Sequence, residues 1–306
     1  MLDEGPGVIG SYDNVTRMAI NFGKYVHGML YFDTAQAQQA AAKGSSLPGV
    51  VWLHPYSYQS GYVENYPRDS TRAFFALAKA GFVVLTYDQA AFGQRVLEKA
   101  NFYRRAANQQ WSLLGELVQD ASSALDALAS AHDGPFPDGL PLKDLYHGKW
   151  YPAVDPSRVY VAGYGLGGIV AAYAAALDQR FAGAAVLSAL TPLRNDSTAW
   201  RTGGNERLYR WHALQPRLGW FTAQEELQQA WPYDYDDVLA LVAPRPALVA
   251  VQELDRTCNV DALLPLLDKA KAAHASLTVS RHANKTNMLD DDLVGDAVAW
   301  LKAQVA

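Results

Sequence analysis

The sequence predicts an α/β domain in which helices cover both faces of a mostly parallel central sheet. Short apolar runs, typical of buried strands, alternate with amphipathic or alanine-rich runs, typical of helices. A glycine-framed turn in "VYVAGYGLGGIVAAY" joins one such strand directly to one such helix. The 306 residues, 50% of them hydrophobic, suffice for one large core. We therefore expect a single domain over residues 1–306.

The first half of the chain alternates predicted strands and helices. Proline on both sides of the apolar run in "LPGVVWLHP" bounds a short buried strand. Asp69 or Ser70 can cap a helix that Gly81 ends, because short polar side chains accept from helix amides and glycine follows helix ends. The predicted elements are strands at 21–33, 47–55 and 82–89 and helices at 69–81 and 109–130.

The second half repeats this alternation around one irregular insertion. Thr191 to about Val242 is rich in aromatic residues and arginines and separates two predicted central strands, so we expect it to form a cap-like insertion within the domain. The other predicted elements are strands at 157–165, 181–190, 245–254 and 276–283 and helices that begin at Leu166, Val260 and about Asp290.

Composition argues against several classes of partner. The net charge is −5, and no run of Lys and Arg is dense enough to follow a phosphate backbone. The longest apolar runs fall short of the roughly 20 residues that cross a bilayer, and the first residues lack a signal-peptide pattern. A single cysteine, Cys258, excludes an internal disulfide framework and a cysteine-rich metal site. We expect a soluble chain with no nucleic-acid partner, membrane span or cofactor; its compartment and oligomeric state stay open.

Polar side chains follow the carboxyl ends of the predicted strands. Because functional groups collect at these ends in a parallel sheet, we expect the following residues to gather at one edge. They are His54, Tyr56, Asp88, the turn at Gly165, Ser188, Glu253, Asp255 and His282.

The segment "VDPSRVYVAGYGLGG" resembles the nucleophile-elbow region of the α/β-hydrolase superfamily, in its dienelactone hydrolase and acetyl xylan esterase-like branch. Three further segments, "YDQAAFGQRV", "AALDQRFAG" and "APRPALVAVQELD", resemble that branch as well, and the likeness extends from about Gly23 to the end. The resemblance implies the α/β-hydrolase fold and a catalytic triad in the order nucleophile, acid, histidine.

This sequence departs from the family pattern at the nucleophile. The elbow reads Gly163, Tyr164, Gly165, Leu166, Gly167, so the position of the attacking serine is occupied by Gly165. The acid corresponds to Asp255. The histidine corresponds either to His282 or to the slot that Thr286 fills, in which case it is missing too.

The resemblance also implies an oxyanion hole and a pocket. The two amide donors correspond to Leu166 and Tyr56, and neither depends on the missing serine. We expect further pocket residues at His54, Asp88, Tyr164, Ser188, Arg194 and Glu253, and no metal ligands.

Three functions remain open at this stage. The chain descends from carboxylic-ester hydrolases that act on acetylated or aryl-esterified carbohydrate, and it lacks the serine for that reaction. It is alternatively a lyase or proton-transfer enzyme that uses His282 and Asp255 as a base next to the oxyanion hole. The third possibility is a protein that binds a small-molecule or carbohydrate ester-like ligand without turnover. The glycine is either natural drift, which relieves strain at the turn, or an engineered inactivation.

Overall fold

The computed structural model describes most of the predicted elements. The described residues are 8–23, 26–57, 61–62, 71–98, 112–130, 151–194, 214–215, 218 and 230–306. Asp69 and Ser70, the proposed helix caps, and most of the insertion from 195 to 229 lie outside them.

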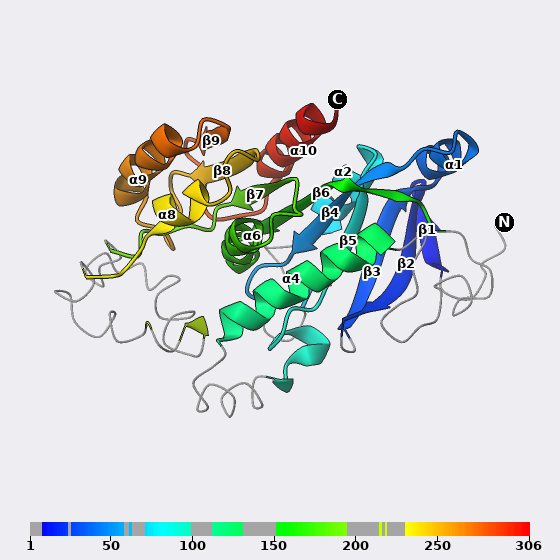
Figure 1. The fold of residues 1–306 in the computed structure, drawn as a ribbon, viewed down its shortest axis with the longest axis horizontal. Coiled ribbons are helices and arrows are strands. Elements are labelled where there is room, and N and C mark those ends of the chain that lie inside the picture. Colours follow the sequence, from blue (N-terminus) through cyan, green and yellow to red (C-terminus); the bar gives the residue numbers. More distant parts are fainter. Residues whose placement is uncertain are drawn as a thin grey trace.

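The strands of the described residues form one sheet in the order β1-β2-β3-β5-β4-β6-β7-β8-β9 (Figure 1). From β5 to β9 neighbouring strands are parallel, whereas β1, β2, β3 and β5 pair antiparallel. The strands are β1 (Val8–Tyr12), β2 (Val15–Phe22), β3 (Val26–Asp33), β4 (Leu47–Leu53), β5 (Val83–Tyr87), β6 (Val154–Tyr164), β7 (Gly183–Leu187), β8 (Ala247–Gln252) and β9 (Leu277–His282).

Helices cover both faces of this sheet, because residues along each strand alternate between two buried clusters. Val51 and Leu53 pack with residues of α4, α6 and α9, whereas Val50 and Trp52 pack with residues of α2 and α10. The helices are α1 (Thr34–Ala42), α2 (Thr71–Lys79), the 3-10 turn η1 (Gly93–Arg95), α4 (Leu113–Ser130), α6 (Leu166–Leu177), α8 (Tyr235–Ala240), α9 (Val260–Ala273) and α10 (Asp291–Val305).

The predicted fold class, a mostly parallel sheet with helices on both faces, is confirmed. The prediction was wrong in detail at the N-terminal side. The expected strand at 21–33 is a hairpin, in which β2 ends at Phe22, Gly23 turns with φ +52°, and β3 starts at Val26. The pairs from Val15 with Asp33 to Phe22 with Val26 extend the sheet beyond its parallel part.

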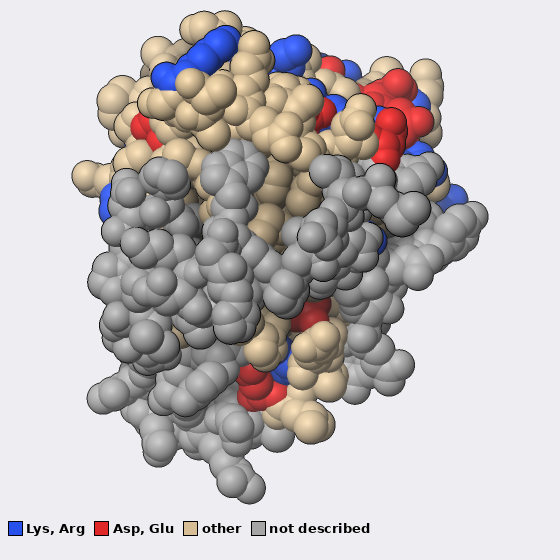
Figure 2. Space-filling model, turned by 90° about the vertical axis from the view of Figure 1, so that its right-hand side faces the viewer, with Lys and Arg blue, Asp and Glu red and all other residues tan. Residues whose placement is uncertain are grey.

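The described part of the surface carries no single-signed charge field on the face drawn in Figure 2, where acidic and basic side chains are interspersed. None of the helices that the structure describes is both long and apolar enough to cross a membrane.

Candidate functional site

The turn between β6 and α6 has the backbone of an elbow. Gly165 stands at φ 57° and ψ −122° immediately before α6, a conformation that L-residues with side chains rarely adopt. Its amide donates to the Leu187 carbonyl at 3.0 Å, and its carbonyl accepts from the Ile169 amide at 3.1 Å. These bonds tie the turn to β7 and to the first turn of α6.

The glycines of this turn differ in the space around them. A Cβ at Gly163 would lie 2.3 Å from the backbone of Gly167, and one at Gly167 would lie 2.0 Å from the Leu53 carbonyl oxygen. A Cβ at Gly165 would meet only Pro55, at 3.5 Å, which is ordinary van der Waals contact. The position of the missing serine therefore has room for a side chain, whereas the positions that frame it have none.

The two candidate oxyanion donors come from different elements. Leu166 is the first residue of α6, whose amides and dipole present partial positive charge at this end. Tyr56 follows β4 and is half-buried, and its ring contacts that of Phe92 edge-on, with centroids 5.2 Å apart. Tyr164, the last residue of β6 and directly before Gly165, is buried in the core.

His54 is fully buried at the end of β4 and both of its ring nitrogens are used. Nδ1 donates to the Pro55 carbonyl at 2.6 Å, and Nε2 accepts from the Gln89 amide at 3.0 Å, so the ring is a neutral imidazole with its proton on Nδ1. Burial lowers the pKa of His54 to about 4. The side chain supports the loop after β4 and has no contact with solvent.

Asp88 holds two loops at the end of β5. Its carboxylate accepts from the amides of Tyr62 and Gln94, both at 2.9 Å, and only 5% of the residue is exposed. A Cβ at Gly61 or Gly93 would collide with this carboxylate, so glycine is needed at both positions for the loops to approach it. Asp88 therefore stabilises the loops that contain Tyr62 and Gln94.

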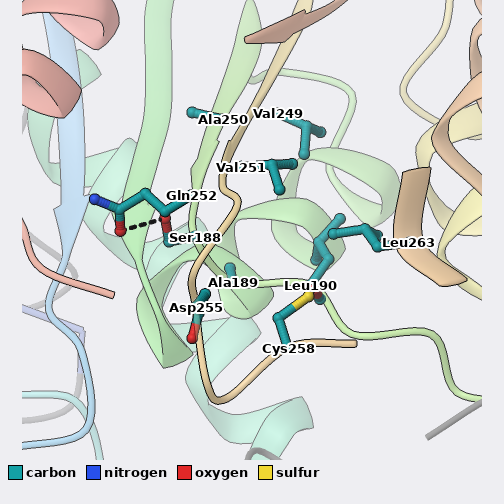
Figure 3. Close-up of a pocket in the computed structure, with 10 residues that line it drawn as sticks. All are labelled: Ser188, Ala189, Leu190, Val249, Ala250, Val251, Gln252, Asp255, Cys258 and Leu263. Atoms are coloured by element: carbon teal, nitrogen blue, oxygen red, sulfur yellow. Dashed lines mark hydrogen bonds between the residues drawn. The ribbon is translucent and has the colours of Figure 1, made fainter. Parts of the chain in front are cut away.

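Asp255 lies in the turn after β8, where the acid is expected. Its Oδ1 accepts from the amide and the hydroxyl of Thr257, each at 2.7 Å, and the residue is buried. Figure 3 shows it in a pocket between the ends of β7 and β8. The lining residues are Ser188, Ala189, Leu190, Val249, Ala250, Val251, Gln252, Asp255, Cys258 and Leu263.

The pocket brings Ser188 and Cys258 near Asp255, but neither is placed as a free nucleophile. The Ser188 hydroxyl donates to Gln252 Oε1 at 2.8 Å, as Figure 3 shows, and the Cys258 thiol donates to the Leu190 carbonyl at 2.9 Å. Leu166 and Tyr56 are not among the described residues that line this pocket. The expectation that they share a pocket with Asp255 remains a prediction.

The two candidates for the histidine position, His282 and Thr286, lie at the end of β9 and in the loop that follows it. As the last residue of β9 it pairs with Gln252, and its Nε2 contacts Asp296 Oδ2 on α10 at 3.1 Å and Ser280 Oγ at 3.4 Å. Among the described contacts the imidazole is thus engaged by Asp296 of α10 and not by Asp255, and the identity of the triad histidine remains a prediction. Thr286 lies exposed in the loop between β9 and α10.

Two other predicted pocket residues make ion pairs. Glu253 binds the Arg281 guanidinium at 2.6 Å. Arg194 donates through Nε to the Trp231 carbonyl at 3.1 Å and lies 3.9 Å from Asp237 of α8. The described contacts of the Arg194 side chain are therefore with the segment around the start of α8. In the described part of the chain, no three His, Cys, Asp or Glu side chains are placed to hold a metal ion.

Sequence reasoning missed Gln252 and Asp296. Gln252 is the polar last residue of an otherwise apolar strand and is only 1% exposed. A polar residue at such a position needs partners, and that signal was available in "ALVAVQ". Asp296 gave no comparable signal, because its contact depends on how α10 docks on the sheet.

No protein-family model and no curated protein matches the chain. Solved structures match it in fold. A glucuronoyl esterase from Solibacter usitatus matches with a TM-score of 0.67 at 16% identity, over 98% of this chain and 86% of that one. A glucuronoyl esterase from Teredinibacter turnerae matches with a TM-score of 0.63 at 16% identity, over 98% and 77%. An esterase from Pyrococcus furiosus matches with a TM-score of 0.55 at 13% identity, over 98% and 99%. The chain has the α/β-hydrolase fold of these esterases.

Proposed function

We propose that the chain binds a carboxylic ester or carboxylate of carbohydrate type at the elbow and does not hydrolyse it through a serine, histidine and acid. The observation that carries this proposal is Gly165, which keeps the backbone of a nucleophile turn and the space for a side chain but has no side chain. The turn is preserved as a binding element without its attacking group.

The expected loss in turnover rate without a nucleophile argues against ordinary ester hydrolysis. Loss of the nucleophile from a serine hydrolase costs about a millionfold in turnover and leaves roughly a thousand- to ten-thousandfold over water. The histidine candidate is also occupied, since His282 contacts Asp296. For the same reason, proton abstraction by a His282 and Asp255 pair finds no support in the described contacts.

Ligand binding needs only groups that remain. The amide of Leu166 at the start of the 12-residue helix α6 suits a carbonyl or carboxylate oxygen. The absent serine side chain leaves room beside Pro55 for a ligand atom. The esterase neighbours include glucuronoyl esterases, which favours an ester or carboxylate of a sugar acid as the ligand class.

Esterase assays on four proteins test the missing hydrolysis. We expect the wild type and Gly165→Ser to hydrolyse p-nitrophenyl acetate no faster than an unrelated protein surface, because the histidine candidate among the described residues, His282, is engaged by Asp296. Gly165→Ser combined with Thr286→His should exceed that background at least tenfold. Gly44→Ser is the matched control, since Gly44 also has a positive φ, +63°, and open space.

Calorimetry with the methyl ester of glucuronic acid tests the binding. We expect saturable binding to the wild type and weaker binding to Gly165→Ser, whose new side chain fills the space. Rapid turnover of p-nitrophenyl acetate by the wild type, with an acyl adduct on any residue, would overturn the proposal. Absence of binding to the ester and to free glucuronate would overturn it equally.

A further inference from the structure

The loop between β9 and α10 is tied to the end of β8 at two points. The Leu254 amide donates to the Lys285 carbonyl at 2.8 Å, and the Gln252 carboxamide donates through Nε2 to the Met288 carbonyl, also at 2.8 Å. Between these ties, the Met288 amide donates to the Thr286 carbonyl at 2.7 Å and closes a tight turn. The backbone of residues 285–288 is therefore held from both sides.

The second tie continues toward the elbow. Gln252 is 1% exposed, and its Oε1 accepts from the hydroxyl of Ser188 at the end of β7. Ser188 follows Leu187, whose carbonyl accepts from the Gly165 amide. Three hydrogen bonds, together with the peptide bond between Leu187 and Ser188, thus link Gly165 through β7 and the Gln252 side chain to Met288 in the loop.

Packing supports the same placement. Leu289, the next residue of the loop, is 4% exposed and belongs to the buried cluster that contains Tyr164 and Leu187. These two residues directly precede Gly165 and Ser188. Leu289 thus anchors the loop on the α2 and α10 face of the sheet, against the last residues of β6 and β7, which directly precede Gly165 and Ser188.

The two residues between the ties are both accessible to solvent. Thr286 is exposed and Asn287 is half-buried. A hydroxyl and a carboxamide together supply donors and acceptors that match the hydroxyl groups of a sugar.

We propose that Ser188 and Gln252 position residues 285–288 next to the elbow, and that Thr286 and Asn287 there contact a hydroxylated carboxylate or ester ligand. The positioning role stands on the contacts above. The ligand contact rests on the proposed function and adds the loop to it as a determinant of specificity.

Amide hydrogen exchange tests the positioning role without any ligand. Gln252→Met keeps an unbranched side chain of similar length but removes the donor to Met288. We expect at least tenfold faster exchange at the amides of Leu254, Met288 and Asp290, each of which is hydrogen-bonded within this loop region. Ser188→Ala, which keeps that donor but frees the carboxamide, should give a smaller increase and provides the test if Gln252→Met does not fold.

Gln36→Met is the matched control, because Gln36 also donates its carboxamide to a backbone carbonyl, that of Lys79, far along the chain. It should leave the exchange of the three loop amides unchanged. Equal exchange in Gln252→Met, Ser188→Ala and the wild type would overturn the positioning role.

Calorimetry with the methyl ester of glucuronic acid tests the ligand contact. We expect Thr286→Ala and Asn287→Ala each to raise Kd about fivefold or more, Thr286→Ser to stay near the wild type, and Thr278→Ala, an exposed threonine on β9, to have no effect. Gln252→Met should raise Kd as well, and its effect should not add to that of Thr286→Ala. If the wild type binds the ester and the loop variants bind it equally well, the ligand contact is wrong although the proposed function holds. If the wild type does not bind, both fail, and the exchange experiment still decides the positioning role.

Discussion

The turn after β6 and the end of β9 differ from the predicted catalytic arrangement in different ways. At the elbow the backbone, the tight glycine contacts and the bond from Gly165 to Leu187 are all present, and only the side chain is missing. At the end of β9 a histidine is present, His282, but it contacts Asp296 on α10. The first region has the backbone geometry of the predicted turn without a side chain at residue 165, whereas the second has a histidine whose described contact is with Asp296.

This difference follows from how each region is built. The elbow geometry is fixed by backbone packing, in which helix α6 lies so close to β4 and β6 that Gly163 and Gly167 admit no Cβ. The place of a histidine depends instead on one side chain and its partner. A single substitution can therefore remove a functional group while the close-packed turn persists.

The largest expected effect tests whether the elbow is really fixed by packing. Gly167→Ala should destabilise the protein by more than about 4 kcal/mol or prevent folding, since its Cβ would lie 2.0 Å from the Leu53 carbonyl oxygen. Gly165→Ala should cost only about 1 to 2 kcal/mol, because it meets strained φ but free space. Urea unfolding of both variants measures the difference, and equal losses would show that space does not distinguish the two glycines.

The next expected effect concerns His54, which supports the loop after β4, where Pro55 lies nearest to the position of a Cβ at Gly165. The pKa of His54 is lowered by burial to about 4 from an ordinary value of 6.5, so between these values the unfolded chain holds a proton that the folded chain does not. Stability should then fall as the pH falls, by about 2 kcal/mol between pH 7 and pH 5 from this residue alone.

Urea unfolding at both pH values, on the wild type and on His54→Gln, isolates that contribution. The variant is expected to be less stable at pH 7 because it loses the bond between the ring and the Gln89 amide. Its stability should nevertheless change less between the two pH values than that of the wild type. Identical pH dependence in both proteins would mean that His54 does not titrate as its burial implies.

Sequence reasoning predicted the parallel sheet and the tight turn between β6 and α6, because periodicity and glycine spacing are local signals. It did not predict the hairpin of β2 and β3, since the apolar run at 21–33 reads as one strand when the turn at Gly23 is overlooked. It also left the histidine undecided. Which carboxylate His282 meets is set by the docking of α10, a long-range contact that no local pattern encodes.

The smallest expected effect concerns His282 at the end of β9 and its partner Asp296. Asp296→Ala removes the partner of His282, and because the Asp296 side chain is 44% exposed we expect a loss of only about 0.5 kcal/mol in unfolding free energy. If the contact with Asp296 alone held the histidine away, Gly165→Ser with Asp296→Ala would gain esterase activity that His282→Ala abolishes. We expect no gain, because residue 282 pairs with Gln252 in the sheet and its carbonyl accepts from the Glu253 amide, which fixes the direction of its side chain. Activity in this double variant would show that the Asp296 side chain alone keeps His282 from acting as the base. No activity in it, beside an active Gly165→Ser, Thr286→His protein, would show that the strand register of residue 282 keeps the histidine from that role.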